Sequence, residues 1–254
     1  APCTPFVTRN VASGNGIGMN SEYTSWDLMI LDADPPVGGM TGQAIGDLEG
    51  DGRLEVVVTG DTALLWYRPA TYERGVIAEG DFHVGVALAD LDGDGRLEVV
   101  AARNLERRPD GGERWSICLY KAGAGPGAPW ECSVLDPELP GGGGPHDLIF
   151  ADLDGDGELE LVATAVYCEV PGLYIYKRSS DWRLPWRRHA VQIGLFGDGT
   201  AVADVDADGY PEIIAGPHLY HCPPGGPFAG PWLHHDLAYG LREMCRTVAI
   251  DITG

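Results

Sequence analysis

The chain has 254 residues and a formal charge of −21 at neutral pH, and 44% of its residues are hydrophobic. This length is sufficient for one well-packed domain, and no apolar run approaches the roughly eighteen residues of a membrane span. The sequence also lacks a basic stripe that could bind phosphates. The composition therefore argues against nucleic acid and anionic membranes as partners.

The two ends of the chain carry short apolar segments that we predict to be strands. Residues 5–12 and 25–33 resemble outer strands without an inner partner, whereas residues 245–252 resemble an inner strand without outer ones. Together they would complete one sheet and protect its edges. The alternative is that the chain belongs to a longer array. The N-terminus, Ala1-Pro-Cys3, lacks an initiator methionine, which is consistent with removal of a leader peptide.

Four similar acidic nonapeptides follow, beginning at Asp47, Asp90, Asp152 and Asp204. Each has acidic residues at positions 1, 3 and 5, glycine at position 6 and glutamate at position 9. The acidic side chains converge only if the chain turns tightly, which glycine permits. Calcium accepts about six to eight oxygen ligands and would relieve the repulsion between neighbouring carboxylates. We therefore predict four calcium sites with the ligands Asp47, Glu49, Asp51 and Glu55; Asp90, Asp92, Asp94 and Glu98; Asp152, Asp154, Asp156 and Glu160; and Asp204, Asp206, Asp208 and Glu212.

The surroundings of each nonapeptide differ from those of an EF-hand, whose bidentate glutamate is at position 12 and whose loop lies between helices. Here the glutamate is followed at once by a short apolar run such as Val56-Val-Val58, and another apolar run precedes the loop. We therefore place each loop between two strands. An acidic surface turn that binds nothing is the alternative for a single copy, but four copies in register favour ion binding.

The spacing of the loops predicts the fold. Their first aspartates are 43, 62 and 52 residues apart, and Asp251 follows 47 residues after Asp204. Repeats of this length with several strands each are typical of a β-propeller. In the second repeat we predict strands at about 84–91, 97–104, 115–121 and 130–136. We expect an all-β chain with about five four-stranded blades in one domain spanning residues 1–254, or a fragment of a seven-bladed propeller.

Pro-Trp dipeptides mark the predicted outermost strand of each repeat. They occur at Pro129-Trp130, Pro185-Trp186 and Pro231-Trp232, with Ser25-Trp26 as a looser copy. A large aromatic side chain at a recurring structural position is expected to pack between neighbouring blades rather than to bind a ligand.

The nonapeptides resemble those of the FG-GAP or VCBS repeat family, from about residue 40 to residue 254. This family includes the integrin α-subunit head, bacterial surface proteins, fungal lectins and some polysaccharide lyases and sugar dehydratases. The resemblance implies an extracellular β-propeller and a calcium role for the acidic residues named above. It implies no single activity, because function depends on sites added to a fold. Two residues depart from the family pattern, since Glu49 replaces an aspartate and Ala207 replaces a glycine.

The six cysteines form an even set, which is consistent with disulfide bonds in a secreted chain. We expect Cys118 to pair with Cys132 across adjacent strands, and Cys3 to pair with Cys245 and so join the termini. The remaining two are Cys168 and Cys222. Buried free thiols are the alternative.

The innermost strand of each repeat should begin six or seven residues before the loop and face a central channel. Those positions hold Thr41, His83, His146 with Asp147, Asp198, and Cys245 with Arg246. Converging imidazole and carboxylate groups can bind zinc or transfer protons on a sugar. The candidate catalytic residues are therefore His83, His146, Asp198 and Arg246, and zinc is a candidate channel ion. The alternative is that these side chains only line a wet channel.

Two functions agree with these features. The first is a secreted, calcium-stabilised recognition module that binds carbohydrate or a protein partner. The second is a carbohydrate-active lyase or dehydratase that uses the channel histidines, with Arg246 neutralising a substrate carboxylate or oxyanion. The sequence contains no Gly-x-Ser-x-Gly elbow, phosphate-binding loop or His-Glu-x-x-His helix, which favours the first function.

Overall fold

The computed structural model describes residues 29–107, 113–123, 128–194 and 197–237. The chain divides into two units, residues 1–35 and 36–254. The described part of the first unit, residues 29–35, contains no strand, so the strand predicted over 25–33 is absent from residues 29–33. The other predicted terminal strands, at 5–12 and 245–252, lie outside the described residues, as does Ser25-Trp26.

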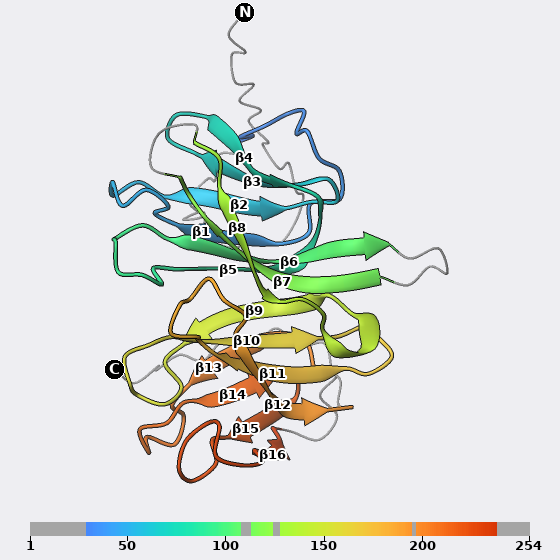
Figure 1. Ribbon diagram of the computed structural model, residues 1–254, viewed down its shortest axis with the longest axis vertical. Coiled ribbons are helices and arrows are strands. Elements are labelled where there is room, and N and C mark those ends of the chain that lie inside the picture. Colours follow the sequence, from blue (N-terminus) through green and yellow to red (C-terminus); the bar gives the residue numbers. More distant parts are fainter. Residues whose placement is uncertain (1–28, 108–112, 124–127, 195–196, 238–254) are drawn as a thin grey trace, which may run out of the picture. The chain divides into compact units, whose positions relative to one another are not determined.

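The described residues of the second unit form four antiparallel sheets of four strands each. Each sheet consists of consecutive strands, so it occupies one continuous range of colour in Figure 1. The first sheet contains β1 (Gln43–Gly46), β2 (Glu55–Thr59), β3 (Ala63–Arg68) and β4 (Glu73–Glu79), and the second contains β5 (Asp81–Ala89), β6 (Glu98–Arg107), β7 (Glu113–Lys121) and β8 (Glu131–Asp136). The third contains β9 (Pro145–Ala151), β10 (Glu160–Ala165), β11 (Gly172–Lys177) and β12 (Arg187–Ile193), and the fourth contains β13 (Thr200–Ala203), β14 (Glu212–Ala215), β15 (His218–His221) and β16 (Leu233–Asp236).

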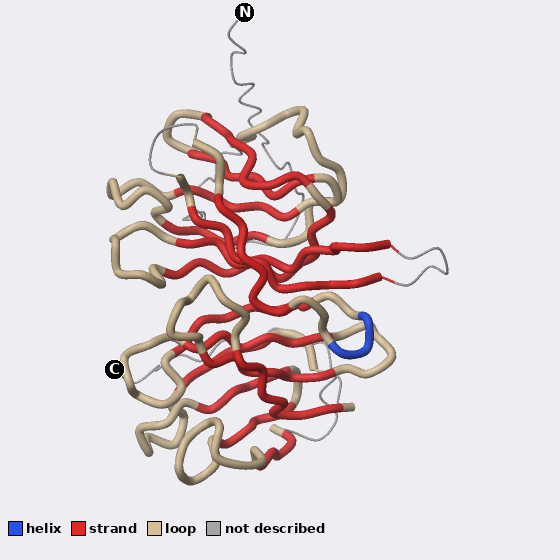
Figure 2. The backbone as a smooth tube through the Cα atoms, in the orientation of Figure 1, coloured by secondary structure: helices blue, strands red, loops and turns tan. Residues whose placement is uncertain are grey.

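The central strands form where the sequence places consecutive apolar residues. All six residues of β10 are buried, whereas β4 and β12, at the outer edges of their sheets, are mostly exposed or half-buried. In the part of the chain that the structure covers, the one helical element is a short 3₁₀ turn, η1 (Pro140–Gly142), which Figure 2 shows in blue. The same residues include no helix with the length and hydropathy needed to cross a membrane.

Hydrophobic clusters fill the spaces between successive sheets, and the predicted tryptophans belong to them. Trp130 packs against the cluster between the first and second sheets. Trp186 and Trp232, each 5% exposed, lie in the clusters between the second and third and between the third and fourth sheets. The prediction that these side chains pack between neighbouring repeats is confirmed.

The all-β class and the four-stranded repeat are also confirmed. The predicted strands of the second repeat correspond to β5–β8, with boundaries that differ by at most three residues. Each acidic nonapeptide connects the first strand of a sheet to the second. No sheet of the described residues closes into a barrel, and the radial arrangement of a propeller stays a prediction.

Candidate functional site: acidic loops and an inner His–Asp cluster

The four acidic loops have similar backbone hydrogen bonds, although in the fourth loop Asp204 accepts from the N–H groups of Asp208 and Gly209 rather than from position 4. In the second loop, Asp90 accepts hydrogen bonds from the N–H groups of Gly93 at 2.7 Å and Gly95 at 2.9 Å. Glu98, the first residue of β6, accepts one from the N–H of Leu91 at 2.8 Å. The equivalent bond is made by Glu55, Glu160 and Glu212. These bonds draw the two ends of each nonapeptide together.

Positions 4 and 6 of each loop have positive φ, which explains the glycines there. In the second loop φ is 74° at Gly93 and 85° at Gly95. In the fourth loop, Ala207 takes position 4 with a φ of 60°. A side chain in this left-handed region costs about 1–2 kcal/mol, so Ala207 keeps the loop conformation at some cost in stability.

Three of the loops bring three potential ligand atoms within 4.8 Å of one another. These groups are Asp90, Asp92 and Asp94; Asp152, Asp154 and Glu160; and Asp204, Asp206 and Asp208. The first loop is described in full, and its acids Asp47, Glu49, Asp51 and Glu55 form no such group among the described residues. The four predicted ligand sets are therefore not equivalent in geometry.

A lysine enters the acidic loop in the second and third sheets. Nζ of Lys121, the last residue of β7, lies 2.7 Å from both Asp92 and Asp94 and 2.8 Å from Glu98. Nζ of Lys177, the last residue of β11, contacts the equivalent acids of the third loop. Its distances are 2.9 Å to Asp154 and 2.7 Å to both Asp156 and Glu160. Each ammonium thus lies among three of the four acidic residues predicted as calcium ligands in its loop.

The first and fourth sheets carry different residues at this place. Arg68 ends β3, and its guanidinium lies 2.9 Å from Glu49 and 2.6 Å from Glu55. Glu49 extends to this arginine, which explains why the first loop does not gather its carboxylates. In the fourth sheet the residue is His221, whose Nδ1 lies 3.6 Å from Glu212 and 3.7 Å from Asp206.

The glutamates at position 9 are buried, which makes their partners important. Glu98 is 1% exposed, and burial raises its pKa while the hydrogen bond from Lys121 acts in the opposite direction. Burial would lower the pKa of Lys121, but its bonds to the three acids raise that pKa above its ordinary value. Lys177 behaves in the same way. Both ammonium groups therefore stay charged.

These strand-end residues were not predicted as partners of the loop acids, although the sequence carries a signal for them. A tyrosine precedes each one, in Tyr67-Arg68, Tyr120-Lys121, Tyr176-Lys177 and Tyr220-His221. The tyrosine side chains are all at most 5% exposed. Because side chains alternate along a strand, the next residue faces away from the core. The antiparallel registers pair each tyrosine with the residue that follows the loop glutamate, so the basic residue lies opposite that glutamate.

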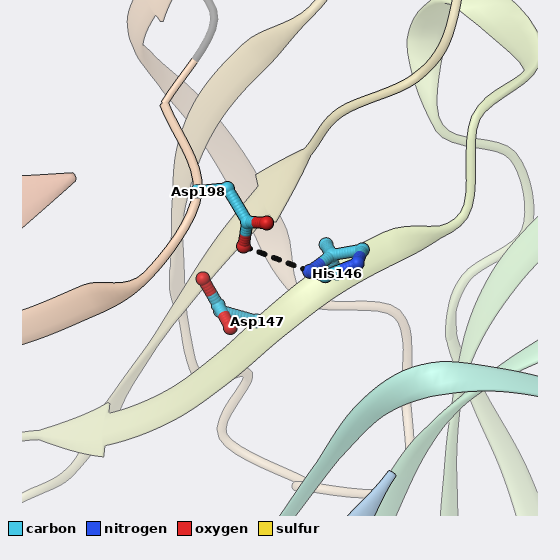
Figure 3. A group of neighbouring side chains, drawn as sticks. All are labelled: His146, Asp147 and Asp198. Carbon is cyan, nitrogen blue, oxygen red and sulfur yellow. Dashed lines mark ion pairs between the residues drawn. The ribbon is translucent and has the colours of Figure 1, made fainter. Parts of the chain in front are cut away.

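A second cluster lies at the start of the first strands, away from the loops. Figure 3 shows His146 of β9 facing Asp198, which precedes β13, and Nδ1 of His146 lies 2.9 Å from Oδ1 of Asp198. The ring centroid of His83 in β5 is 5.7 Å from that of His146. Burial, together with the neighbouring His146, lowers the pKa of His83. The structure thus brings together three of the four predicted catalytic candidates; Arg246 lies outside the described residues.

Asp147, next to His146, has a structural role. Its Oδ2 accepts hydrogen bonds from the N–H of Gly199 at 3.0 Å, the N–H of Thr200 at 3.0 Å and the hydroxyl of Thr200 at 2.9 Å. It therefore joins β9 of the third sheet to the start of β13 in the fourth.

A cavity of about 600 Å³ lies beside this cluster. Its lining includes Thr41, Gln43, Val86, His146, Asp147 and Thr200. The first strands of all four sheets thus contribute to one cavity, as expected for the inner strands of repeats around an axis. With Nδ1 of His146 facing Asp198, Nε2 is the nitrogen that can exchange a proton with a ligand. Oxygen and nitrogen atoms of His146, Asp147 and Asp198 also lie within 4.8 Å of one another, close enough to share a metal ion.

The described cysteines are free thiols, so the predicted bond between Cys118 and Cys132 is not formed in the structure. The neighbouring thiol of Cys118, with smaller contributions from Tyr120 and Arg103, lowers the pKa of Cys132. Cys168 and Cys222 are likewise free thiols. Cys3 and Cys245 lie outside the described residues.

Comparison with known proteins identifies one repeat. Residues 47–101, from the first acidic loop into β6, match the family described as FG-GAP-like repeat. The chain contains an FG-GAP-like repeat. The resemblance inferred from the nonapeptides is confirmed for this stretch, which holds the first two of the four loops.

A solved structure with a similar backbone is the V. cholerae biofilm matrix protein Bap1. The two chains are 19% identical with a TM-score of 0.43, over 76% of this chain and 30% of that one. This chain therefore spans about a third of the length of that protein. The search of curated proteins gave no match.

Proposed function

We propose that this protein is a secreted or cell-surface β-propeller that binds calcium and serves as a recognition module for carbohydrate or a protein partner. The observation that carries the proposal is the fourfold recurrence of one unit, a four-stranded sheet with an acidic loop after its first strand. The cavity shared by the four first strands supports a radial arrangement. The FG-GAP-like repeat at residues 47–101 supports the assignment of the units.

The second and third loops are the strongest calcium candidates. Their carboxylates converge, and carboxylate oxygens are the ligands that calcium prefers. Lys121 and Lys177 each supply only one positive charge to a predicted ligand set of four acidic residues, so a divalent ion that displaces the ammonium would relieve more repulsion. In the first loop we propose Arg68 as the resident cation, because its guanidinium already holds Glu49 and Glu55.

The extracellular location is proposed on the same chemistry. Calcium loops of extracellular modules often have dissociation constants of about 10⁻⁴–10⁻³ M, which millimolar calcium outside cells would fill. The acidic surface and the absence of a basic stripe favour partners other than nucleic acid.

Metal analysis and thermal unfolding test the calcium proposal. Protein dialysed against EDTA should lose its bound calcium and unfold at a lower temperature than protein in millimolar calcium, because an ion that binds only the folded state stabilises it. Asp92→Ala should remove one calcium ion and leave the others. Equal melting temperatures with and without calcium, or loss of all calcium in Asp92→Ala, would contradict the proposal.

A carbohydrate-active lyase or dehydratase is the second candidate, and the His146–Asp198 pair beside the cavity favours it. Imidazole held by a carboxylate is suited to removing a proton from a sugar carbon, and the same residues with Asp147 have the ligand types for zinc. Glycan-array binding and turnover assays on polyuronides and ketosugars, each with wild type and His146→Ala, separate the two functions. Binding that persists in His146→Ala without turnover by either protein supports the module, whereas turnover that His146→Ala abolishes supports the enzyme.

A further inference from the structure

The fourth sheet differs from the other three in the residue that lies opposite the buried loop glutamate. The residue opposite the buried loop glutamate is Arg68, Lys121 or Lys177 in the first three sheets, and His221 in the fourth. Arginine and lysine bring a permanent positive charge and no free lone pair. Histidine can instead offer a neutral nitrogen ligand. We infer that the fourth loop binds a transition-metal ion of the zinc class through Asp206, Glu212 and His221.

The distances agree with donors that share an ion. Nδ1 of His221 lies 3.6 Å from Oε1 of Glu212 and 3.7 Å from Oδ2 of Asp206. These separations are too long for hydrogen bonds, whereas ligands about 2.1 Å from a tetrahedral zinc ion are separated by about 3.4 Å. Ligand atoms of the three residues all lie within 4.8 Å of one another. In the second and third loops, by contrast, the lysines make direct contacts of 2.7–2.9 Å with their acids.

Glu212 is held in position for this role. The residue is 1% exposed, and its Oε2 accepts a hydrogen bond from the N–H of Val205 at 2.9 Å. This bond leaves Oε1 directed towards His221. A buried carboxylate without a fixed cation beside it is costly, and a bound metal ion removes that cost. The other three loops meet the same requirement with arginine or lysine.

The ion class follows from the mixed donor set. Calcium prefers oxygen ligands only, whereas imidazole suits zinc, copper, iron and nickel. A second imidazole lies close by, because the rings of His221 and His235 are 4.7 Å apart between centroids on the paired strands β15 and β16. This assignment goes beyond the proposed calcium role, which would use Asp204, Asp206, Asp208 and Glu212 without a nitrogen ligand.

Zinc titration of the metal-free protein in millimolar calcium tests the inference, with two variants that exchange residues between equivalent sheets. Wild type should bind zinc, and His221→Lys, which reproduces the second and third sheets, should weaken zinc binding at this site by at least about 100-fold. Lys177→His, the reverse exchange, should add a second zinc site. Cobalt should give visible absorption bands of a nitrogen-ligated ion in wild type but not in His221→Lys. His146→Ala is the control, because His146, Asp147 and Asp198 form a separate candidate metal group.

The outcomes separate this site from others. Zinc affinity that is unchanged in His221→Lys but lost in His146→Ala would overturn the inference and place the ion in the inner cluster. Displacement of zinc by equimolar calcium, or no zinc binding at all, would also overturn it. If His221→Lys does not fold, His221→Gln removes the nitrogen ligand without adding a charge and should give the same loss. Calcium binding by the second and third loops should be unaffected, so the calcium proposal is tested independently.

Discussion

Acidic groups lie near both ends of β9, the first strand of the third sheet, and they have different partners at the two ends. At the loop end, buried Glu160 accepts a hydrogen bond from the N–H of Leu153 and contacts the ammonium of Lys177. At the other end, Oδ1 of Asp198 and Nδ1 of His146 are buried and lie 2.9 Å apart, and neither atom has a hydrogen-bond partner among the described residues. Glu160 is thus satisfied by the backbone and by an internal cation, whereas the inner pair has no such partner and retains bonding capacity for a ligand. Acidity alone therefore does not distinguish a structural site from a functional one; the partners of each acid do.

Removing the internal cation of the third loop is expected to lower the stability of the protein more than any other change proposed below. Lys177→Met leaves Glu160 buried without its positive partner, and we expect a loss of about 3 kcal/mol in the free energy of unfolding, measured by urea denaturation in EDTA. Calcium should restore part of this loss, because the divalent ion can replace the ammonium.

Arg183→Met is the matched control for that experiment. Arg183 makes a surface ion pair of 3.5 Å with Asp181, both side chains are about half exposed, and its guanidinium lies 4.2 Å from the centroid of the Trp182 ring, so its removal should change stability by no more than about 1 kcal/mol. A loss for Lys177→Met no larger than for Arg183→Met would show that the ammonium contributes nothing to the loop.

At the inner end of β9, we expect Asp147 to stabilise the fold, whereas the neighbouring His146 remains available to a ligand. Asp147→Ala removes the acceptor for three hydrogen bonds to Gly199 and Thr200 and should destabilise the protein by about 2 kcal/mol. Asp147→Asn keeps one acceptor oxygen and should lose less. Unfolding free energies that are the same for both variants and the wild type would show that this connection between β9 and β13 does not stabilise the fold.

Within the loops, the strain at Ala207 gives a smaller and opposite effect. Ala207→Gly should stabilise the protein by about 1 kcal/mol, because glycine adopts a φ of 60° without steric cost. Gly155→Ala makes the reverse change at the same position of the third loop, where an added Cβ has no atom within 4 Å. It should destabilise by a similar amount. Melting temperatures that shift in the same direction for the two variants would contradict this account.

The repeat architecture could be predicted from the sequence because its signals are local. Each acidic nonapeptide is followed directly by an apolar strand such as β6, and a Pro-Trp pair precedes β8, β12 and β16. The spacing of these signals is sufficient to place four strands in a repeat. The calcium ligand sets followed from the same local pattern, and their ion binding stays a prediction.

The partners of the loop acids could not be predicted in the same way, because the register of the sheets brings them together. Lys121 is 23 residues after Glu98, whereas Lys177 is 17 residues after Glu160 and His221 is 9 residues after Glu212. No constant spacing connects the pairs, since the turns between second and third strands differ in length. The inner cluster was easier to predict from the sequence, because His83, His146 and Asp198 all lie near the start of the first strand of a sheet.

The smallest expected effect is a pH dependence of the free energy of unfolding, which arises from His83 in the inner cluster. Burial, then the neighbouring His146, lowers the pKa of His83 in the folded state, while Asp81 and Glu113 act in the opposite direction. His83 then binds a proton more readily in the unfolded chain than in the folded one. Its contribution to the stability of the fold is therefore complete above a pH of about 6.5 and is lost as the pH falls below that value. The slope from one proton cannot exceed about 1.4 kcal/mol per pH unit, and we expect well under that. His83→Gln should lose less stability than wild type between pH 7.5 and 5.5 in urea denaturation. Identical slopes for the two proteins would show that His83 ionises equally in both states and that the inner cluster exerts no effect on it.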